Sequence, residues 1–141
     1  MVKPRVLFLC TGNSARSQMA EGILRSFAGD RFEVLSAGID PKGVNPLAIQ
    51  AMREDGIDIS GHRSKHVTEF LGQPMQYVIT VCDGAQEKCP IFPGAYKFLS
   101  WSFDDPAAAQ GSDADKLTVF RRVRDEIGQH IQQEFAVKGH A

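Results

Sequence analysis

The chain has 141 residues, of which 43% are hydrophobic and 23% charged, and its formal net charge is −1. These values predict one soluble globular domain over residues 1–141 that buries a core without disulfides or a metal. A charge near zero gives no reason to expect nucleic acid or membranes as partners. The apolar run at the N-terminus is too short for a signal peptide or a membrane span, so we expect a cytoplasmic protein.

The first part of the chain alternates strand and helix patterns. Val6–Leu9 is a short apolar run, typical of a strand that is buried on both faces. Residues 16–28 carry apolar side chains at helical spacing, and Gly29 is expected to end that helix. Phe32–Ser36 predicts a second strand. A strand, a helix and a second strand in this order are typical of a parallel sheet.

The rest of the chain continues this alternation. The expected elements are a helix opened by Asn45-Pro46 and closed by Gly56, a short helix at His66–Leu71, strands at Tyr77–Val81 and Lys97–Trp101, and a last helix that starts near Ser112 or Asp113. The last helix has an apolar stripe, made of Phe120, Val123, Ile127 and Ile131. The order predicts an α/β, single-domain, three-layer fold, with a four-stranded parallel sheet and helices on both faces.

Reactive side chains are expected at one edge of this sheet, because ligands bind beyond the carboxyl ends of parallel strands. Cys10 ends the first strand, Cys82 follows the third, and Asp104-Asp105-Pro106 follow the fourth. Taken alone, a cysteine at a strand end is more often a small buried hydrophobe, and an Asp-Pro pair is more often a turn. Three such groups at one edge favour a catalytic site.

The stretch "LFLCTGNSARS", Leu7–Ser17, has the composition of an anion cradle that opens a helix. Its backbone N–H groups can turn inward, Gly12 and Asn13 permit the turn, and Arg16 offers a planar fork for two oxygens. The expected oxyanion-binding residues are Thr11, Gly12, Asn13, Ser14, Ala15 and Arg16. The motif is not a Walker A loop, because the second glycine and the Gly-Lys pair are absent.

Cys10 is the expected nucleophile at the bottom of this cradle. The helix N-terminus and Arg16 both favour a thiolate, so its pKa should fall below the free value of about 8.5. Ser17 could donate a hydrogen bond to the sulfur. Asp105, after the fourth strand, is the candidate acid, with Asp104 as a solvated neighbour.

The chain resembles a known family at these residues. "CTGNSARS" resembles the C-x5-R-S loop of the low-molecular-weight tyrosine phosphatase fold, and "DDP" resembles that fold's general acid. The likeness continues through "SQMAEG", "SAGI", "GVNPLAI", "GIDISGH", "FDDPA" and "FRRVRDEI", which cover nearly the whole chain in order. With Cys82 and Cys89 added, the chain resembles the thioredoxin-coupled arsenate reductases.

The resemblance implies a relay of three cysteines. Cys10 attacks arsenate, Arg16 and the loop amides hold its oxygens, and Asp105 protonates the leaving oxygen. Cys82 then attacks Cys10, which releases arsenite and leaves a Cys10–Cys82 disulfide. Cys89 converts this into a Cys82–Cys89 disulfide, and reduced thioredoxin supplies the electrons. The resemblance further implies a monomer with no bound cofactor, for which phosphate and sulfate are arsenate analogues.

Other functions stay open at this point. The same cradle and acid would serve a phosphatase that hydrolyses phosphate monoesters. Ala107–Ala109 after the Asp-Pro pair offer no aromatic wall for a phenyl ring, which favours a small inorganic oxyanion. A non-catalytic thiol redox protein or arsenite-binding protein is a third reading, and glutaredoxin could replace thioredoxin as reductant. "CDGAQEKCP" has few apolar anchors and includes Gly84, so it is expected to change shape.

The sequence departs from the family's pattern in two places. Ala15 stands where many members carry another cysteine. Some members bind potassium through an Asn, a Glu, a Ser and an Asp; Asn13, Glu21 and Ser36 match the first three, but Lys65 replaces the Asp. An ammonium there could substitute for the cation, so we expect no bound metal and no potassium dependence. In the alternative, Lys65 is solvated and the site is simply empty.

The remaining candidate residues have structural explanations. Arg121, Arg122 and Arg124 lie beside acidic residues, and a solvated face is expected, although a contact with a redox partner stays open. Trp101 is expected to pack beside the fourth strand and the Asp105 loop. The histidines, His62, His66, His130 and His140, form no recognisable metal-ligand set.

Overall fold

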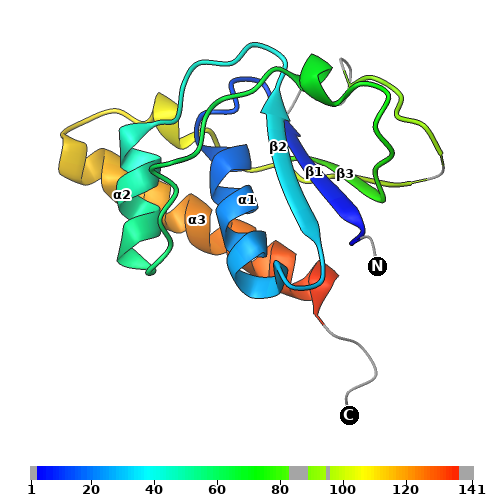
Figure 1. The fold of residues 1–141 in the computed structure, drawn as a ribbon. Coiled ribbons are helices and arrows are strands. Elements are labelled where there is room, and N and C mark those ends of the chain that lie inside the picture. Colours follow the sequence, from blue (N-terminus) through cyan, green and yellow to red (C-terminus); the bar gives the residue numbers. More distant parts are fainter. Residues whose placement is uncertain (1–2, 83–88, 95, 137–141) are drawn as a thin grey trace.

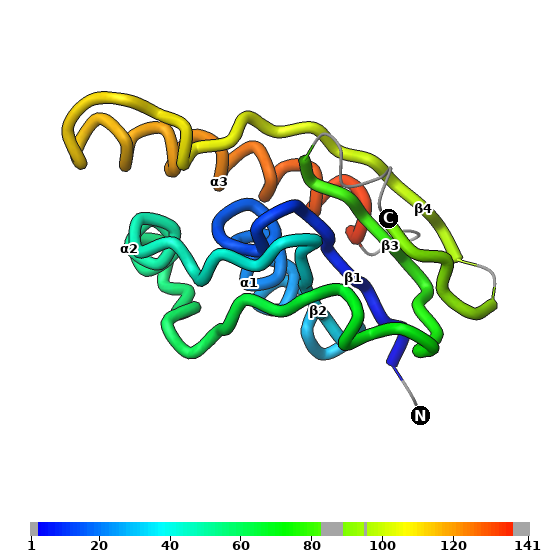
Figure 2. The backbone as a smooth tube through the Cα atoms, turned by 90° about the horizontal axis from the view of Figure 1, so that it is seen from above, coloured from blue at the N-terminus to red at the C-terminus, as the bar shows by residue number. Residues whose placement is uncertain are grey.

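The computed structural model describes residues 3–82, 89–94 and 96–136, and its centre is a four-stranded parallel sheet. The strands are β1 (Arg5–Cys10), β2 (Glu33–Gly38), β3 (Tyr77–Thr80) and β4 (Lys97–Ser100). They lie in the order β2-β1-β3-β4, which Figure 2 shows side by side. The predicted parallel sheet is confirmed. β1 and β2 stay paired up to Cys10 and Gly38, so Gly38 lies beside the end of β1.

Helices connect and cover these strands (Figure 1). The structure has the α-helices α1 (Arg16–Ala28), α2 (Pro46–Glu54) and α3 (Asp113–Phe135), and the 3-10 helices η1 (Val67–Phe70) and η3 (Pro106–Ala108). α1 packs on β1 and β2 and on α3, and α3 also contacts α2. Among the described residues, no helix combines the length and the apolar composition that crossing a membrane requires.

Local sequence explains where the helices begin and end. Asn45 caps α2 by accepting a hydrogen bond from the N–H of Leu47, and Gly56 follows the helix with a left-handed φ of 75°. Ser112 opens α3 in a capping box with Asp115. Gly29 follows α1 as expected, but its φ of −64° is right-handed, so it is not a left-handed cap.

The core lies on both faces of the central strand. Five consecutive residues, Val6–Cys10, are buried, as expected for a strand covered on both sides. The predicted stripe of α3 is buried throughout. Trp101 packs on Phe8, with ring centroids 6.3 Å apart, and on Phe103, at 6.4 Å. The aromatic side chains therefore join the end of β4 to the core beneath the Asp105 loop.

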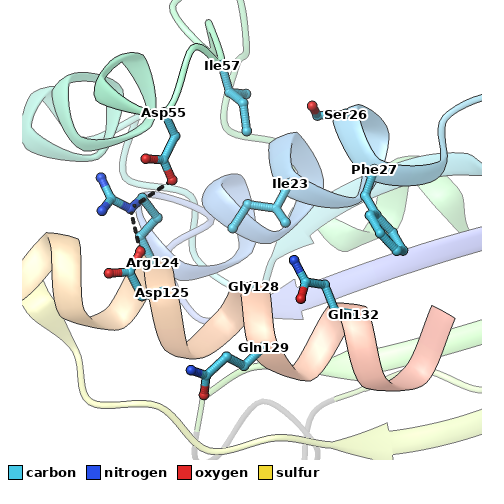
Figure 3. Close-up of a pocket in the computed structure, with 10 residues that line it drawn as sticks. All are labelled: Ile23, Ser26, Phe27, Asp55, Ile57, Arg124, Asp125, Gly128, Gln129 and Gln132. Carbon is cyan, nitrogen blue, oxygen red and sulfur yellow. Dashed lines mark hydrogen bonds and ion pairs between the residues drawn. The ribbon is translucent and has the colours of Figure 1, made fainter. Parts of the chain in front are cut away.

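Arg124 is buried, so a solvated face for this arginine is wrong. Its side chain donates a hydrogen bond to the carbonyl of Ala51 at 2.8 Å and pairs with Asp55 at 3.2 Å and Asp125 at 2.9 Å (Figure 3). These contacts fasten α3 to the C-terminal end of α2, where unpaired helix carbonyls need donors. Arg121 is exposed at the surface, where it pairs with Glu54.

Candidate active site

The loop between β1 and α1 lies where the strand order reverses. β2 lies on one side of β1 and β3 on the other. The connection that follows β1 leads to β2, and the connection that follows β2 crosses back over β1 to β3. In an open α/β sheet this is where ligands bind, beyond the carboxyl ends of the strands. The predicted cradle therefore begins at the position that the fold favours for a ligand site.

Donors outside the loop bind its carbonyl groups. They are the N–H of Ile39 to Cys10 (3.2 Å), of Asp40 to Thr11 (2.8 Å), of Lys42 to Gly12 (2.9 Å) and of Asn45 to Ser14 (2.9 Å), and the hydroxyl of Ser64 to Asn13 (2.6 Å). These bonds occupy the carbonyls, so the loop amides can turn the other way. The amides of Thr11 and Asn13 bind the cysteine sulfurs, and the others can form an anion-binding nest.

Three residues shape the loop. Asn13 has a left-handed φ of 45°, the alternation that a nest of inward amides requires. Gly12 is not in the left-handed region; instead a Cβ there would lie 3.2 Å from Cγ of Lys42. Gly38 is needed for a different reason, since a Cβ there would lie 2.7 Å from the carbonyl oxygen of Thr11. β2 can approach the cradle only because this position has no side chain.

The N-terminus of α1 has no capping side chain and no acidic residue in its first turn. Its free N–H groups and the helix dipole are thus available to an anion. Arg16, the first residue of α1, donates to the carbonyl of Phe103 at 3.1 Å, and its other terminal nitrogen lies 3.8 Å from Asp105. The arginine therefore links the cradle to the Asp105 loop.

A cavity of about 280 Å³ opens over the cradle. Its lining residues are Cys10, Thr11, Gly12, Ser14, Ala15, Arg16, Lys42, Asp105 and Ala107. The structure thus brings the predicted nucleophile, arginine and acid to one hollow that suits a small tetrahedral oxyanion.

The two aspartates after β4 have separate contacts. Asp105 caps η3 by accepting a hydrogen bond from the N–H of Ala107 at 3.0 Å, and its other carboxylate oxygen faces Arg16. Asp104 pairs instead with Arg122 of α3 at 3.0 Å and does not line the cavity. This placement supports Asp105, and not Asp104, as the acid.

Cys10 and Cys82 are both buried, each about 2% exposed, and both accept hydrogen bonds from the loop. Sγ of Cys10 receives the N–H of Asn13 at 3.2 Å and lies 2.8 Å from the hydroxyl of Ser17. Sγ of Cys82 receives the N–H of Thr11 at 3.2 Å, and the Thr11 hydroxyl lies 3.6 Å away. The loop therefore stabilises negative charge on either sulfur.

The two cysteines share one negative charge. A hydrogen bond from Cys10, with those from Thr11 and the charge of Arg16, lowers the pKa of Cys82 to about 6. The same bond, together with burial, raises the pKa of Cys10 well above its ordinary value. The lowered pKa expected at Cys10 is not found while Cys82 is ionised, because two neighbouring sulfurs do not both ionise.

A pH titration of thiolate absorbance in the ultraviolet measures this shared charge. We expect one thiolate to appear with a midpoint at about 6 and to be lost as the pH falls below it. Cys10→Ser removes the main hydrogen bond to Cys82, so the midpoint should rise. Cys89→Ser serves as control and should keep the midpoint of the pair. Absence of any thiolate at neutral pH would contradict the shared charge.

Cys89 differs from this pair in burial and in its hydrogen bonding. It is half-buried, its thiol donates to the carbonyl of Pro90 at 3.4 Å, and burial raises its pKa. All three cysteines are free thiols. The segment that was expected to change shape, Cys82–Pro90, includes Gly84, and its residues 83–88 lie outside the described residues.

A buried chain of hydrogen bonds supports the cradle from behind. Ser36 donates to Glu21 at 2.5 Å, and the side-chain amide of Asn13 donates to Ser36 at 3.0 Å and to Ser17 at 2.8 Å. Ser17 in turn contacts Sγ of Cys10. Since Asn13 supplies the donor to Ser17, the Ser17 hydroxyl hydrogen is available to the sulfur.

Lys65 lies beside this chain, and the residues do not fit a bound potassium ion. Its ammonium is 3.8 Å from Glu21 and donates to the carbonyl of Arg63 at 2.9 Å. The other oxygen of Glu21 receives Arg25 at 2.5 Å, so two cations already neutralise this carboxylate. Burial lowers the pKa of Lys65. Within the described part of the chain, no three or more His, Cys, Asp or Glu residues are grouped so that they could hold a metal ion.

Two residues of this site were not singled out from the sequence. Gly38 appears there only within "SAGI", and its role depends on the close approach of β2 to the loop. Lys42 lines the cavity, but nothing in its local sequence points to the cradle. Neither position carries a local signal, because both depend on where the chain returns after β2.

Comparison with known proteins agrees with this geometry. Residues 5–138 match the family model described as low molecular weight phosphotyrosine protein phosphatase. A protein of Halalkalibacterium halodurans named arsenate reductase is 51% identical over 132 residues, which cover 94% of this chain and 95% of that protein. A relative that matches nearly the whole of this chain is thus named as an arsenate reductase.

Solved structures give the same result. A structure described as an arsenate reductase in the phosphate binding state has a TM-score of 0.75 and 32% identity, and covers 94% of this chain and 97% of that one. A thioredoxin-dependent arsenate reductase of Corynebacterium glutamicum has a TM-score of 0.66 and 31% identity; 94% of this chain matches 63% of that one.

Proposed function

This chain belongs to the low molecular weight phosphotyrosine protein phosphatase family and, within it, to the arsenate reductases, and we propose that its three cysteines reduce arsenate by a relay regenerated by thioredoxin. The single observation that carries the proposal is that the buried sulfurs of Cys10 and Cys82 both receive hydrogen bonds from the same cradle loop and lie close enough to shift each other's pKa. A phosphatase needs only the first sulfur, whereas a reductase needs a second one within reach.

The first step is a displacement at arsenic. The loop amides, the N-terminus of α1 and Arg16 hold the arsenate oxygens, and Sγ of Cys10 attacks the arsenic. The proton of Cys10 passes to the neighbouring Cys82 thiolate, whose low pKa depends on its interaction with Cys10. Asp105 donates a proton to the leaving oxygen, which departs as water.

The second step transfers the electrons. Cys82 gives up the proton that it received from Cys10, and its Sγ attacks Sγ of Cys10. The sulfur–arsenic bond breaks, and its electron pair stays on arsenic, which leaves as arsenite. Overall, one arsenate oxygen leaves as water, arsenic gains two electrons and the two sulfurs form a disulfide. The proton given up by Cys82 replaces the one that Asp105 donated. The Thr11 hydrogen bonds and Arg16 favour the thiolate that Cys82 needs for this attack.

The last steps move the disulfide outward. Cys89 attacks Cys82, which releases the thiolate of Cys10, and reduced thioredoxin then opens the Cys82–Cys89 disulfide. Support comes from burial, since Cys10 and Cys82 are almost fully covered and Cys89 is only half-buried. All three cysteines belong to one chain, so we expect a monomer to be sufficient.

The test is NADPH oxidation with thioredoxin and thioredoxin reductase, with and without arsenate. The proposal predicts oxidation that depends on arsenate. Replacing thioredoxin with glutaredoxin and glutathione tests the alternative reductant. Arsenate-dependent turnover only with glutaredoxin would contradict the thioredoxin step, and no turnover with either would contradict the relay.

We expect a weak phosphatase activity as well, because the cradle and the acid Asp105 suit a phosphate monoester. Hydrolysis of p-nitrophenyl phosphate should be abolished in Cys10→Ser and reduced about a hundredfold or more in Asp105→Asn. Cys82→Ser should retain it, since hydrolysis uses one sulfur. Loss of hydrolysis in Cys82→Ser but not in Cys10→Ser would show that Cys82 is the nucleophile, which contradicts the role given to Cys10.

Potassium should not activate the enzyme, because Lys65 and Arg25 already neutralise Glu21. We expect equal kcat/KM for arsenate in sodium and potassium chloride of the same concentration. Lys65→Asp restores an acidic side chain at this position and should introduce a potassium response. Clear potassium activation of the wild type would contradict the role given to Lys65.

A further inference from the structure

Lys42 lies at the mouth of the oxyanion cavity, on the segment that returns after β2. Its backbone N–H donates to the carbonyl of Gly12 at 2.9 Å, so the main chain is tied to the cradle. Its side-chain stem lies over Gly12, where an added Cβ would meet Cγ of Lys42 at 3.2 Å. The first part of the side chain is therefore held in place above the loop.

The positive charge of Lys42 faces the same hollow as Arg16. Among the described residues that line this cavity, Arg16 and Lys42 are the cations and Asp105 is an anion. The two cations differ in exposure: the side chain of Arg16 is 15% exposed and that of Lys42 is 63% exposed. Arg16 thus lies at the base of the cavity and Lys42 at its rim.

The ammonium of Lys42 is paired with Asp40 at 2.8 Å. Both side chains are well exposed, and exposed pairs of this kind are weak, so exchanging the partner costs little. Beyond Cγ, the lysine stem is flexible and carries three donors that need no fixed orientation. The ammonium can consequently turn from Asp40 toward an anion in the cavity.

We propose that Lys42 is a second oxyanion-binding side chain, which exchanges Asp40 for the outer oxygens of a doubly charged oxyanion. The proposal rests on the proposed oxyanion site and adds a rim cation to it. Its physical basis is charge: a dianion in the cradle meets one full positive charge from Arg16, while Asp105 and the shared thiolate oppose it. A second cation compensates for that opposition and raises the local concentration of dianions.

The experiment is calorimetric titration of the reduced protein with sulfate, a dianion, and with perchlorate, a monoanion of the same shape. Lys42→Met keeps the stem over Gly12 and removes the charge. It should weaken sulfate binding about fivefold at low salt, and less at high salt. The effect on perchlorate should be smaller. Lys42→Arg should restore sulfate binding, and Asp40→Asn should tighten it, because the competing carboxylate is gone.

The matched control is Lys97→Met, which removes an exposed lysine that is paired with Glu134 far from the cavity. It should bind sulfate like the wild type. Equal sulfate affinity in Lys42→Met and wild type, or an equal loss in Lys97→Met, would overturn the proposal while the oxyanion site remains. A wild type that binds neither anion would overturn the site and the proposal together. A folding defect cannot explain the tighter binding expected of Asp40→Asn.

Discussion

The Cys89→Ser variant is expected to form one arsenite per protein molecule and then stop. The sulfurs of Cys10 and Cys82 lie close enough to shift each other's pKa, and the two suffice for the electron transfer to arsenic. The resulting disulfide joins two residues that are each about 2% exposed in the reduced protein, so we expect that a protein reductant cannot reach it. Steady-state turnover with thioredoxin should fall by at least about a hundredfold. Arsenite is measured after one turnover, and the trapped disulfide is identified by mass spectrometry.

Two matched variants separate the steps of this relay. Cys10→Ser should form no arsenite, because arsenate has no nucleophile. Cys82→Ser should form none either, because the second electron-donating sulfur is missing, although it can still bind arsenate. If Cys89→Ser turned over at the rate of the wild type, thioredoxin would have to reduce the buried disulfide directly, and the relay would consist of two cysteines.

Arg16→Lys is expected to lower kcat/KM for arsenate by about a hundredfold or more, because the lysine keeps the charge and loses the fork. Arg16 also donates to the carbonyl of Phe103, which holds the Asp105 loop against the cradle. An ammonium cannot contact two arsenate oxygens and this carbonyl in one plane. The measurement is kcat and KM in the thioredoxin-coupled assay.

Arg121→Lys is the control for this loss. Arg121 also uses two nitrogens on one carboxylate, with both contacts to Glu54 at 2.7 Å, but it lies on the outer surface of α3. The control should have the activity of the wild type. Wild-type kinetics in Arg16→Lys would show that charge alone holds the oxyanion, and the fork would have no catalytic role.

Much of this fold could be predicted because its signals are local. The ends of α2 follow from the backbone preferences of Asn45, Pro46 and Gly56. The apolar composition of Val6–Leu9 predicts a buried strand. The cradle was predictable for the same reason, since Cys10 and Arg16 belong to one short loop. The boundaries of β1 and β2 were harder to predict, because each strand continues as long as its neighbour supplies hydrogen bonds.

The parts that could not be predicted depend on contacts between distant segments. The pKa values of Cys10 and Cys82 follow from the approach of two sulfurs at the ends of neighbouring strands, which no local pattern encodes. Arg124 looks like a surface arginine in its helix, yet the C-terminal end of α2 covers it. Gly38 and Lys42 acquire their roles only when β2 and the segment after it pack on the cradle.

The outward carbonyls of the loop have a consequence for the protein as a whole. Their hydrogen bonds hold the loop amides close to one another, with like partial charges side by side. The sulfurs of Cys82 and Cys10 accept from the amides of Thr11 and Asn13 only, which leaves a mutual repulsion among the other loop amides. An anion relieves it, and any ligand that binds only the folded chain shifts the unfolding equilibrium by mass action. The melting temperature of this protein is therefore a property of the protein and its buffer anion together.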